Sequence, residues 1–243
     1  ATHPKLGVHR LEHNYDEAGA ETALAYRDGL GALVAGADGW ARRVTRYNAS
    51  GQVEVIAFEG PDGQPVGRAI DGVARLFHFY GLEGRLMQVA SSGASGRPIA
   101  REGGYGREVW EYDSEGRVTA ESWFDLIEAP MTHLGRDCAR ETITYGPQGH
   151  ESERRCLDAD GQPTISSKWD AAGLRWERDG RGLLVRETSL DAKGAPMMTR
   201  KGYATKSTRY DGRGAVFTES FLDANGGPTF GSEGWSERRY SRD

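Results

Sequence analysis

The stretch Glu111–Val118, EYDSEGRV, recurs along the chain at a nearly constant interval. Its kernel, Tyr-Asp-x-x-Gly, stands again at Tyr15–Gly19 and at Tyr210–Gly214. A motif that returns at a fixed interval predicts a repeat architecture, in which each copy forms one small structural element. Less complete copies stand at Tyr47–Gly51, Tyr80–Gly84 and Tyr145–Gly149.

We call the residue that stands eight residues before each kernel tyrosine position the marker of its repeat, and each repeat begins at its marker. Successive markers are 32 or 33 residues apart. A glycine stands twelve residues after each of the first seven markers, and a proline stands twenty-six residues after six of them. The markers are Gly7, Gly39, Gly72, Gly104, Asp137, Asp170, Gly202 and Gly234. They predict repeats 1 to 7 at approximately 7–38, 39–71, 72–103, 104–136, 137–169, 170–201 and 202–233, followed by a half-repeat at 234–243.

Each repeat has the pattern of two strands joined by a turn. In repeat 2 the strands are 39–47 and 52–58, both rich in residues that favour a pleated sheet. The polar pair and Gly51 between them are typical of a three-residue hairpin loop, in which glycine takes the left-handed conformation. A second turn, such as Asp158–Pro163, then leads to the next repeat, and its proline prevents pairing as a central strand. We therefore expect about fourteen short strands.

The predicted fold is all-β: tandem β-hairpin repeats stacked into a curved or spiral, solenoid-like antiparallel sheet, with 1–243 as a single repeat array. One hairpin cannot bury its apolar face alone, so neighbouring repeats must stack on each other. The twist between adjacent strands coils a sheet of this many strands or closes it into a barrel, and the sequence leaves both forms open.

Composition restricts the class of protein. Apolar residues make up 37% of the 243 residues, which is low for a compact globule, and the 34 glycines are periodic, which excludes a disordered linker. The net charge of −5 gives no electrostatic footprint for nucleic acid. No apolar run is long enough for a membrane-spanning helix. The chain begins at Ala1 without a methionine, so we expect either a removed leader or a piece of a longer protein.

The kernel pattern also suggests a family. Gly104, Tyr112-Asp113 and Gly116–Val118, with the same positions around Gly202 and Tyr210, resemble the tyrosine-aspartate (YD) repeats of bacterial RHS proteins and animal teneurins. The resemblance implies consecutive hairpins in a large spiral sheet, which encloses a toxic domain in polymorphic toxins and belongs to an adhesion molecule in teneurins. Two features depart from that family, namely the longer period and the added Gly-x-Pro turn.

Two sets of residues recur at fixed positions and are the candidate binding residues. An arginine three residues after the marker predicts a ladder along one face, either solvated and paired with Glu54 and Glu121 or forming a groove for an anionic ligand or a partner. Aromatic residues directly after the marker are either core residues or a platform for carbohydrate or a partner, and Gly-Trp openings also resemble cell-wall-binding hairpin repeats. The arginines are Arg10, Arg42, Arg75, Arg107 and Arg140, and the aromatic residues are Trp40, Tyr105 and Trp235.

The sequence predicts no catalytic residue, cofactor or metal site. Cys138 and Cys156 fall on paired strands of one hairpin, so an oxidising compartment would allow a disulfide between them, and the sequence leaves open whether it forms. No histidine is placed to activate either thiol. Asp158 and Asp160 resemble the opening of a calcium loop but lack its remaining ligands, and we expect such aspartates to cap turns.

We expect an extracytoplasmic location, the cytoplasm being the alternative.

Repeats 3 and 6 depart from the pattern. In repeat 3 the stretch Ser91–Gly96 replaces the usual aromatic residue and aspartate, and in repeat 6 Arg178 takes the tyrosine position while Trp176 supplies the bulk. Such departures mark either a functional face or a relaxed constraint.

We interpret the chain as a non-catalytic binding, adhesion or recognition module that acts through its extended sheet surface on a protein partner. One alternative is a glycan- or cell-wall-binding repeat module that uses the recurrent aromatic positions. A second alternative is an immunity or inhibitor protein that neutralises a toxin. An enzyme is the least favoured reading, because a regular repeat leaves few irregular loops on which a site can be built.

Overall fold

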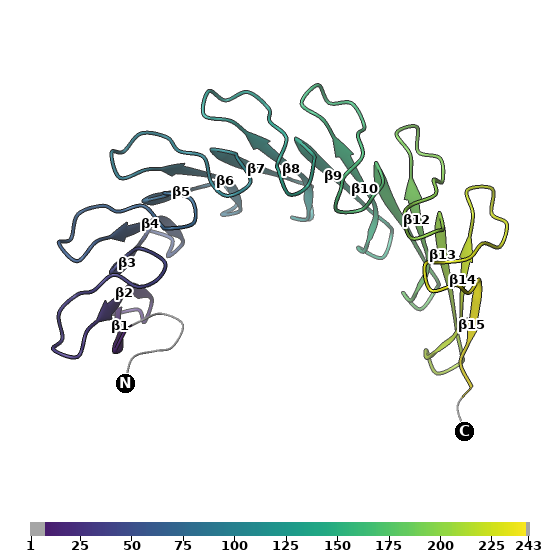
Figure 1. Ribbon diagram of the computed structural model, residues 1–243, viewed down its shortest axis with the longest axis horizontal. Helices are drawn as coiled ribbons and strands as arrows, with labels where there is room; N and C mark the ends of the chain where they lie inside the picture. The colour runs from purple at the N-terminus through teal and green to yellow at the C-terminus, as the bar shows by residue number, and fades with distance from the viewer. Residues whose placement is uncertain (1–7, 242–243) are drawn as a thin grey trace. The chain divides into compact units, whose positions relative to one another are not determined.

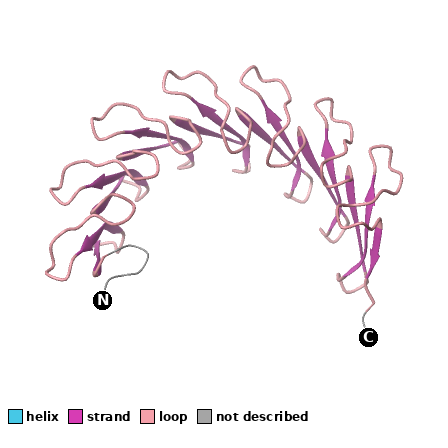
Figure 2. Ribbon diagram, viewed as in Figure 1, coloured by secondary structure: helices cyan, strands magenta, loops and turns pink. Residues whose placement is uncertain are grey.

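The computed structural model describes residues 8–241, and its only regular structure within that range is β-strand (Figure 2). Fifteen strands follow one another in sequence order in a single sheet, each antiparallel to the next (Figure 1). The prediction of an all-β fold of tandem antiparallel hairpins is confirmed. The strands are β1 Arg10–Tyr15, β2 Glu21–Arg27, β3 Arg42–Tyr47, β4 Val53–Glu59, β5 Arg75–Tyr80, β6 Leu86–Ser92, β7 Arg107–Tyr112, β8 Val118–Phe124, β9 Arg140–Tyr145, β10 Glu151–Leu157, β11 Gly173–Arg178, β12 Leu184–Leu190, β13 Thr205–Tyr210, β14 Val216–Leu222 and β15 Glu237–Arg239.

The kernel motif forms the corner of each hairpin, as the sequence predicts. Between β3 and β4, Gly51 has φ 74° and its N–H donates to the carbonyl of Asn48 at 3.0 Å. The strand register shifts at Tyr47, which is the bulge expected beside a left-handed glycine. In the kernel of repeat 4, Asp113 braces the turn, because its Oδ1 accepts the N–H groups of Glu115 and Arg117 at 2.9 and 3.0 Å.

The marker position also requires left-handed backbone. Gly39 has φ 90° there, and Asp137 and Asp170 both have φ 57° although they are not glycines. Their carboxylates bind the far end of the same repeat: Asp137 accepts the N–H of Ser167 at 3.2 Å, and Asp170 accepts both the N–H and the side chain of Arg200 at 2.5 and 2.9 Å. An aspartate marker therefore also connects the start of its repeat with the end of the same repeat through its side chain.

The kernel tyrosines connect neighbouring repeats on the sheet. In four repeats the tyrosine hydroxyl donates to a backbone carbonyl at the start of the second strand of the preceding repeat, over 2.8 to 2.9 Å. A phenol that is partly buried in this way keeps its hydroxyl satisfied while its ring covers the neighbouring hairpin. The pairs are Tyr47 with Glu21, Tyr80 with Val53, Tyr145 with Val118 and Tyr210 with Leu184.

The chain divides into two compact units. The first comprises Ala1–Trp110 and Trp123–Ala129, and the second comprises Glu111–Ser122 and Pro130–Asp243. No helix in the described part of the chain is long and apolar enough to cross a membrane.

The core of each unit is built from the residue directly after the marker and from a residue near the end of the second strand. In the first unit Trp40 stacks on Tyr26 and contacts Phe58, with ring centroids 4.2 and 5.7 Å apart, and Val8 completes the cluster. In the second unit the rings of Tyr203, Phe221 and Trp235 stack in series at 4.3 and 4.5 Å. These cross-strand contacts bury the apolar surface that a single hairpin would leave exposed.

Repeat 5 uses a disulfide at the positions where other repeats pair aromatic rings. Cys138 follows the marker and Cys156 lies near the end of β10, and the structure joins them with Cα atoms 5.3 Å apart. Both are fully buried. A covalent link therefore replaces ring stacking at this step of the second unit's core.

Candidate interaction surface

All five predicted arginines stand at the first position of the first strand of their repeat. Four of them belong to the first unit, and Arg140 belongs to the second. Within the first unit Arg42, Arg75 and Arg107 share one sheet face, because residues directly opposite each other on paired strands lie on the same face and the register connects all three positions. We call this face the arginine face. Its composition decides whether the arginines form a solvated ladder or part of a binding surface.

Most ladder arginines have acidic partners, but not those that the sequence suggests. Arg42 binds Glu59, its cross-strand neighbour, at 2.6 Å. Arg10 lies 3.5 Å from Glu12. Glu54 and Glu121, the expected partners, instead lie 3.8 Å from Arg46 and 3.0 Å from Arg136. The expectation was wrong because register sets the partner of a strand residue: Glu59 lies opposite Arg42, whereas Glu54 lies beside Arg46 at the other end of β4.

Arg140 is held most firmly. Both of its terminal nitrogens bind Glu111, at 2.6 and 2.8 Å, and one also donates to Ser122 at 3.0 Å. The hydrogen bonds from Arg140 hold the pKa of Glu111 below its usual value, and Glu111 in turn raises the pKa of Arg140. A guanidinium engaged in this bidentate way is not free to bind a ligand.

Arg75 and Arg107 differ from the other three. Within the described part of the chain, no carboxylate forms an ion pair with either guanidinium. Arg107 instead lies over the ring of Phe124, 4.4 Å from its centroid, and 3.4 Å from Gln88. Arg75 is half-buried and borders a hollow on the arginine face. It is therefore the ladder arginine best placed to receive an anionic group from outside the chain.

The hollow beside Arg75 combines charge with apolar surface. Its volume is about 430 Å³, and its apolar wall is formed by Val44, Val55 and Phe77 on three successive strands. Register places Val55 directly opposite both Arg46 and Phe77. Phe79, two residues beyond Phe77 on the same face, is 49% exposed. We call this hollow the Phe77 groove, defined by Val44, Arg46, Val55, Arg75 and Phe77.

The second unit has no comparable apolar strip at the corresponding positions of its described strands. The places of Val44 and Phe77 are taken by Thr142, Arg175 and Ser207. Arg175 is paired with Glu153, and the hydrogen bonds to Arg155 and Arg175 hold the pKa of Glu153 below its usual value against the effect of burial. The groove is thus a local feature of the first unit and not a property of the repeat.

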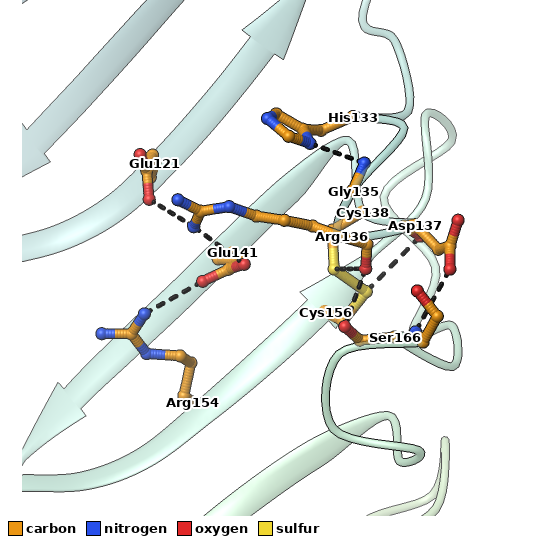
Figure 3. The surroundings of a disulfide bond; sticks show 11 residues. Glu121, His133, Gly135, Arg136, Asp137, Cys138, Glu141, Arg154, Cys156 and Ser166 are labelled. Atoms are coloured by element: carbon orange, nitrogen blue, oxygen red, sulfur yellow. Dashed lines mark hydrogen bonds and ion pairs between the residues drawn. A yellow bond between two sulfur atoms is a disulfide. The ribbon is translucent and has the colours of Figure 1, made fainter. Parts of the chain in front are cut away.

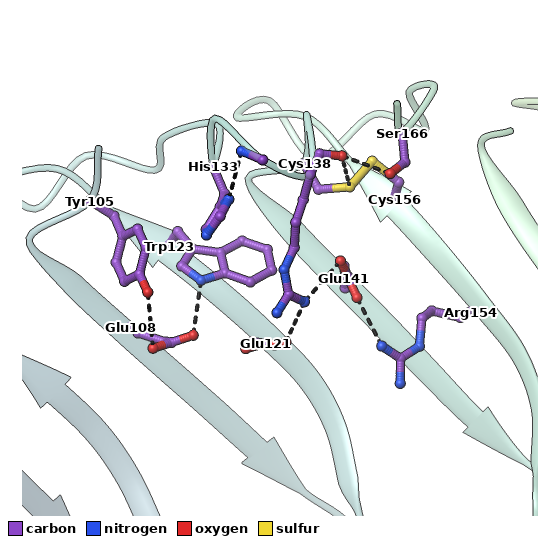
Figure 4. Close-up of polar contacts among 12 residues, drawn as sticks. Tyr105, Glu108, Glu121, Trp123, His133, Cys138, Glu141, Arg154, Cys156 and Ser166 are labelled. Carbon is purple, nitrogen blue, oxygen red and sulfur yellow. Dashed lines mark hydrogen bonds and ion pairs between the residues drawn. A yellow bond between two sulfur atoms is a disulfide. The ribbon is translucent and has the colours of Figure 1, made fainter. Parts of the chain in front are cut away.

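The predicted aromatic positions lie mainly in the core. Trp40 is 6% exposed and Tyr105 is 9% exposed, and Trp235 is half-buried against Phe221. Figure 4 shows Tyr105 and Trp123 both directed at Glu108, which accepts the indole N–H of Trp123 at 3.0 Å. Arg101 lies over the Tyr105 ring and binds the same carboxylate at 3.0 Å. Tyr105 therefore offers little ring surface to a ligand.

Trp40 borders a cavity on the opposite sheet face of the first unit. This cavity has a volume of about 640 Å³ and is also lined by Asp38, Arg43 and Phe58. Asp38 accepts the hydroxyl of Tyr26 at 2.9 Å through one oxygen, while its other oxygen is buried without a hydrogen bond. Burial, and next the hydrogen bond to Asp38, raise the pKa of Tyr26.

An ionic cluster lies next to the disulfide in the second unit (Figure 3). Glu141 is fully buried and binds Arg136 at 3.1 Å and Arg154 at 3.0 Å. Arg136 also binds Glu121, and its carbonyl accepts the hydroxyl of Ser166 at 2.7 Å. Because every one of these charges is compensated within the fold, we assign the cluster a structural role.

The aspartates of the second turns cap those turns. Asp158 accepts the N–H groups of Asp160 and Gln162 at 3.0 and 2.8 Å, so its Oδ1 is already occupied. His13 binds Glu21 at 2.6 Å, and His9 precedes β1. The described residues contain no cluster of three or more potential metal ligands.

Sequence reasoning missed the apolar half of the groove. Val44 alternates with polar neighbours, but Val55 precedes Ile56 and Phe77 follows Leu76, so the pattern along these strands does not show which side chains meet across them. A comparison of the repeats would have found the signal, because Phe77 stands where the other repeats have smaller or polar residues.

Comparison with known proteins gives a likeness of architecture only. No family model and no curated protein matches the chain. Among solved structures it is similar to a chain of the Photorhabdus luminescens Tc holotoxin pore, at 12% identity and TM-score 0.39 over 88% of this chain. It is also similar to chains in the crystal structures of TcdB2-TccC3-Cdc42, at 13% identity and TM-score 0.40 over 88% of this chain, and of TcdB2-TccC3-TEV, at 12% and 0.40 over 96%. The chain spans only about 11 to 12% of the length of those chains, and similarity at this level says nothing about function.

Proposed function

We propose that this chain is a non-catalytic recognition module that binds a protein partner at the Phe77 groove. The observation that carries the proposal is the position of Arg75, a half-buried cation with no acidic partner among residues 8–241, at the edge of an apolar hollow. A guanidinium beside apolar surface is a typical centre of a protein interface, where a carboxylate from the partner is recognised in a desolvated setting.

The groove favours a partner that presents an acidic side chain next to an apolar one. The carboxylate would bind Arg75, and the apolar side chain would cover Phe77 and Val55. Arg46, whose side chain is 66% exposed, would then lie at the polar rim and act mainly on the rate of association. Phe79 would extend the apolar contact along β5.

We also propose that the chain is an RHS-like repeat segment of a secreted or surface protein, where it acts in adhesion or recognition. The Tyr-Asp-x-x-Gly corners support the family proposal, and the Cys138–Cys156 disulfide supports an oxidising compartment.

Photo-crosslinking from the groove tests the protein-binding proposal. A crosslinking amino acid at Phe79, which is 49% exposed, should trap one partner from extracts of the source organism. With that partner purified, Arg75→Glu should weaken binding by about tenfold or more, because the charge reversal repels the expected carboxylate.

Arg209→Glu is the matched control. Arg209 is an exposed arginine on a first strand of the second unit, and the same charge reversal there should leave affinity unchanged. Equal effects of the two variants, or full affinity in Arg75→Glu, would contradict binding at the groove.

Glycan binding is the second candidate, and the Trp40 cavity favours it. The rings of Trp40 and Phe58 together with the guanidinium of Arg43 form a lining suited to the ring and hydroxyl groups of a sugar. Cell-wall fragments should then quench tryptophan fluorescence, and Trp40→Phe should reduce that change. Unchanged fluorescence across a panel of glycans would exclude this candidate.

A further inference from the structure

The series of tyrosine hydroxyls that connects neighbouring repeats is broken in repeat 6. Arg178 occupies the kernel position there, at the end of β11, and its side chain is exposed. Its Nη1 donates to the carbonyl of Gly182 within its own turn, at 3.1 Å. The arginine therefore does not reach back to repeat 5 in the way that Tyr145 and Tyr210 reach back to their preceding repeats.

A cavity lies at the place where the missing tyrosine ring would be. It has a volume of about 350 Å³ and is lined by the turn of repeat 5 and by the end of β11. Pro147, His150 and Glu151 border it on one side, and Trp176 and Arg178 border it on the other. This volume is at the lower limit for small-ligand pockets, about 300–1,000 Å³, and thus suits a single ring.

The polar group that a tyrosine would bind is present in this cavity. The carbonyl of Val118 accepts the hydroxyl of Tyr145, which lies 27 residues later. Position 178 likewise lies 27 residues after Glu151, so the Glu151 carbonyl is the equivalent acceptor. No side-chain donor to the Glu151 carbonyl is found among the described residues, although the Glu151 carboxylate binds Arg154 at 2.7 Å. The acceptor is therefore in place without its donor.

The walls also correspond to those around a kernel tyrosine. Arg117 lies over the ring of Tyr145, 4.6 Å from its centroid, and His150 takes the place of Arg117 beside the cavity. The indole of Trp176 is fixed by its hydrogen bond to Glu187 at 3.0 Å and supplies an apolar wall. A flat aromatic ring can thus be held between a fixed indole and an imidazole.

We propose that this cavity, the Arg178 pocket, binds a phenol ring from outside the chain, with its hydroxyl donating to the carbonyl of Glu151. Four tyrosines of the same protein show the binding mode, since each places a ring against the preceding hairpin and donates over 2.8 to 2.9 Å. The phenol comes from a tyrosine side chain of a polypeptide or from a free phenolic molecule. The pocket belongs to the second unit, so the inference does not depend on the Phe77 groove.

Protein-observed NMR with N-acetyl-tyrosinamide as the probe tests the proposal. The indole N–H signal of Trp176, assigned by its loss in Trp176→Phe, should shift and saturate as the probe is added. N-acetyl-phenylalaninamide should bind about two- to tenfold more weakly, because it lacks the one hydrogen bond to Glu151. Equal affinity for the two probes, or shifts that do not saturate, would overturn the inference.

Arg178→Tyr provides the decisive variant, because it restores the tyrosine found in the other repeats and fills the pocket from within. It should abolish binding of N-acetyl-tyrosinamide while the far-UV spectrum and the thermal transition show an intact fold. Arg209→Tyr makes the same exchange at an exposed position of β13 and should bind as the wild type does. Undiminished binding by Arg178→Tyr would place the probe elsewhere and refute the assignment.

The source of the phenol is resolved by two further probes, a blocked tripeptide with a central tyrosine and p-cresol. Tighter binding of the tripeptide assigns the pocket to a tyrosine presented by a polypeptide. Equal or tighter binding of p-cresol assigns it to a free phenolic molecule. Both results support the pocket, whereas failure of both probes contradicts it, and neither result bears on the Arg75→Glu experiment.

Discussion

The second turn of each repeat supplies a sharp test of the repeat geometry. Its left-handed position holds a glycine in the other repeats, such as Gly161 with φ 77°, but in repeat 4 it holds Glu128 with φ 69°. A residue other than glycine in this conformation costs of order 1–3 kcal/mol. Replacing it with glycine adds about 0.4–1 kcal/mol of conformational freedom to the unfolded chain. Glu128→Gly should therefore stabilise the protein by roughly 1 kcal/mol.

Denaturant unfolding measures this effect. The midpoint should rise at an unchanged slope, and the thermal midpoint should rise by about 2–4 °C for each 1 kcal/mol in a chain of this length. Gly161→Glu is the reverse experiment in repeat 5, and it is free of steric clash because a Cβ there meets no atom within 4 Å. It should destabilise by a similar amount. If Glu128→Gly left stability unchanged or lowered it, the explanation of the turn glycines by backbone strain would be wrong.

Three further predictions concern the second unit. Glu141→Ala removes a fully buried carboxylate from between two arginines and should cost about 3 kcal/mol of unfolding free energy, the lower end for a broken buried pair, as denaturant titration would reveal. Reduction of the Cys138–Cys156 disulfide, which spans a separation of 18 residues, should cost about 3 kcal/mol, and unchanged unfolding in reductant would contradict this. The hydrogen bond from Lys206 lowers the pKa of Glu219 from its ordinary 4.5, so this pair stabilises the fold above about pH 4.5 and loses its effect as the pH falls through the lowered pKa. Glu219→Gln should flatten the acid limb of a stability–pH curve, and an unaltered limb would count against the assignment.

The hairpins were predictable because their determinants are local. A glycine at a fixed distance after the kernel tyrosine specifies a left-handed turn whatever the rest of the fold does, and Gly116 has φ 85° as that rule requires. Asp113 braces its own turn for the same reason. Local chemistry of this kind can be read from one sequence because no distant contact is needed to decide it.

The candidate site was less predictable because it depends on register between strands that belong to different repeats. The sequence placed Arg75 on a ladder, but it did not show that Val55 would lie opposite Phe77, since the loop of repeat 2 sets that register. The position of Trp40 was ambiguous for a related reason. Whether an aromatic residue near a strand end is core or platform depends on neighbouring rings, and here Tyr26 and Phe58 enclose it.

The hydrogen bond between a kernel tyrosine and the preceding repeat has a consequence for how such a chain can grow. A repeat with a kernel tyrosine contributes one hydroxyl toward the repeat before it, and its second strand offers one carbonyl to the repeat after it, as Tyr145 and Val118 show. A duplicated copy would bring both halves of the bond and could join the array without compensating substitutions elsewhere. Duplication of a repeat with a kernel tyrosine should therefore change the stability of the array little. A duplicated repeat 6 would instead lack the tyrosine hydrogen bond and would add a second Arg178 pocket.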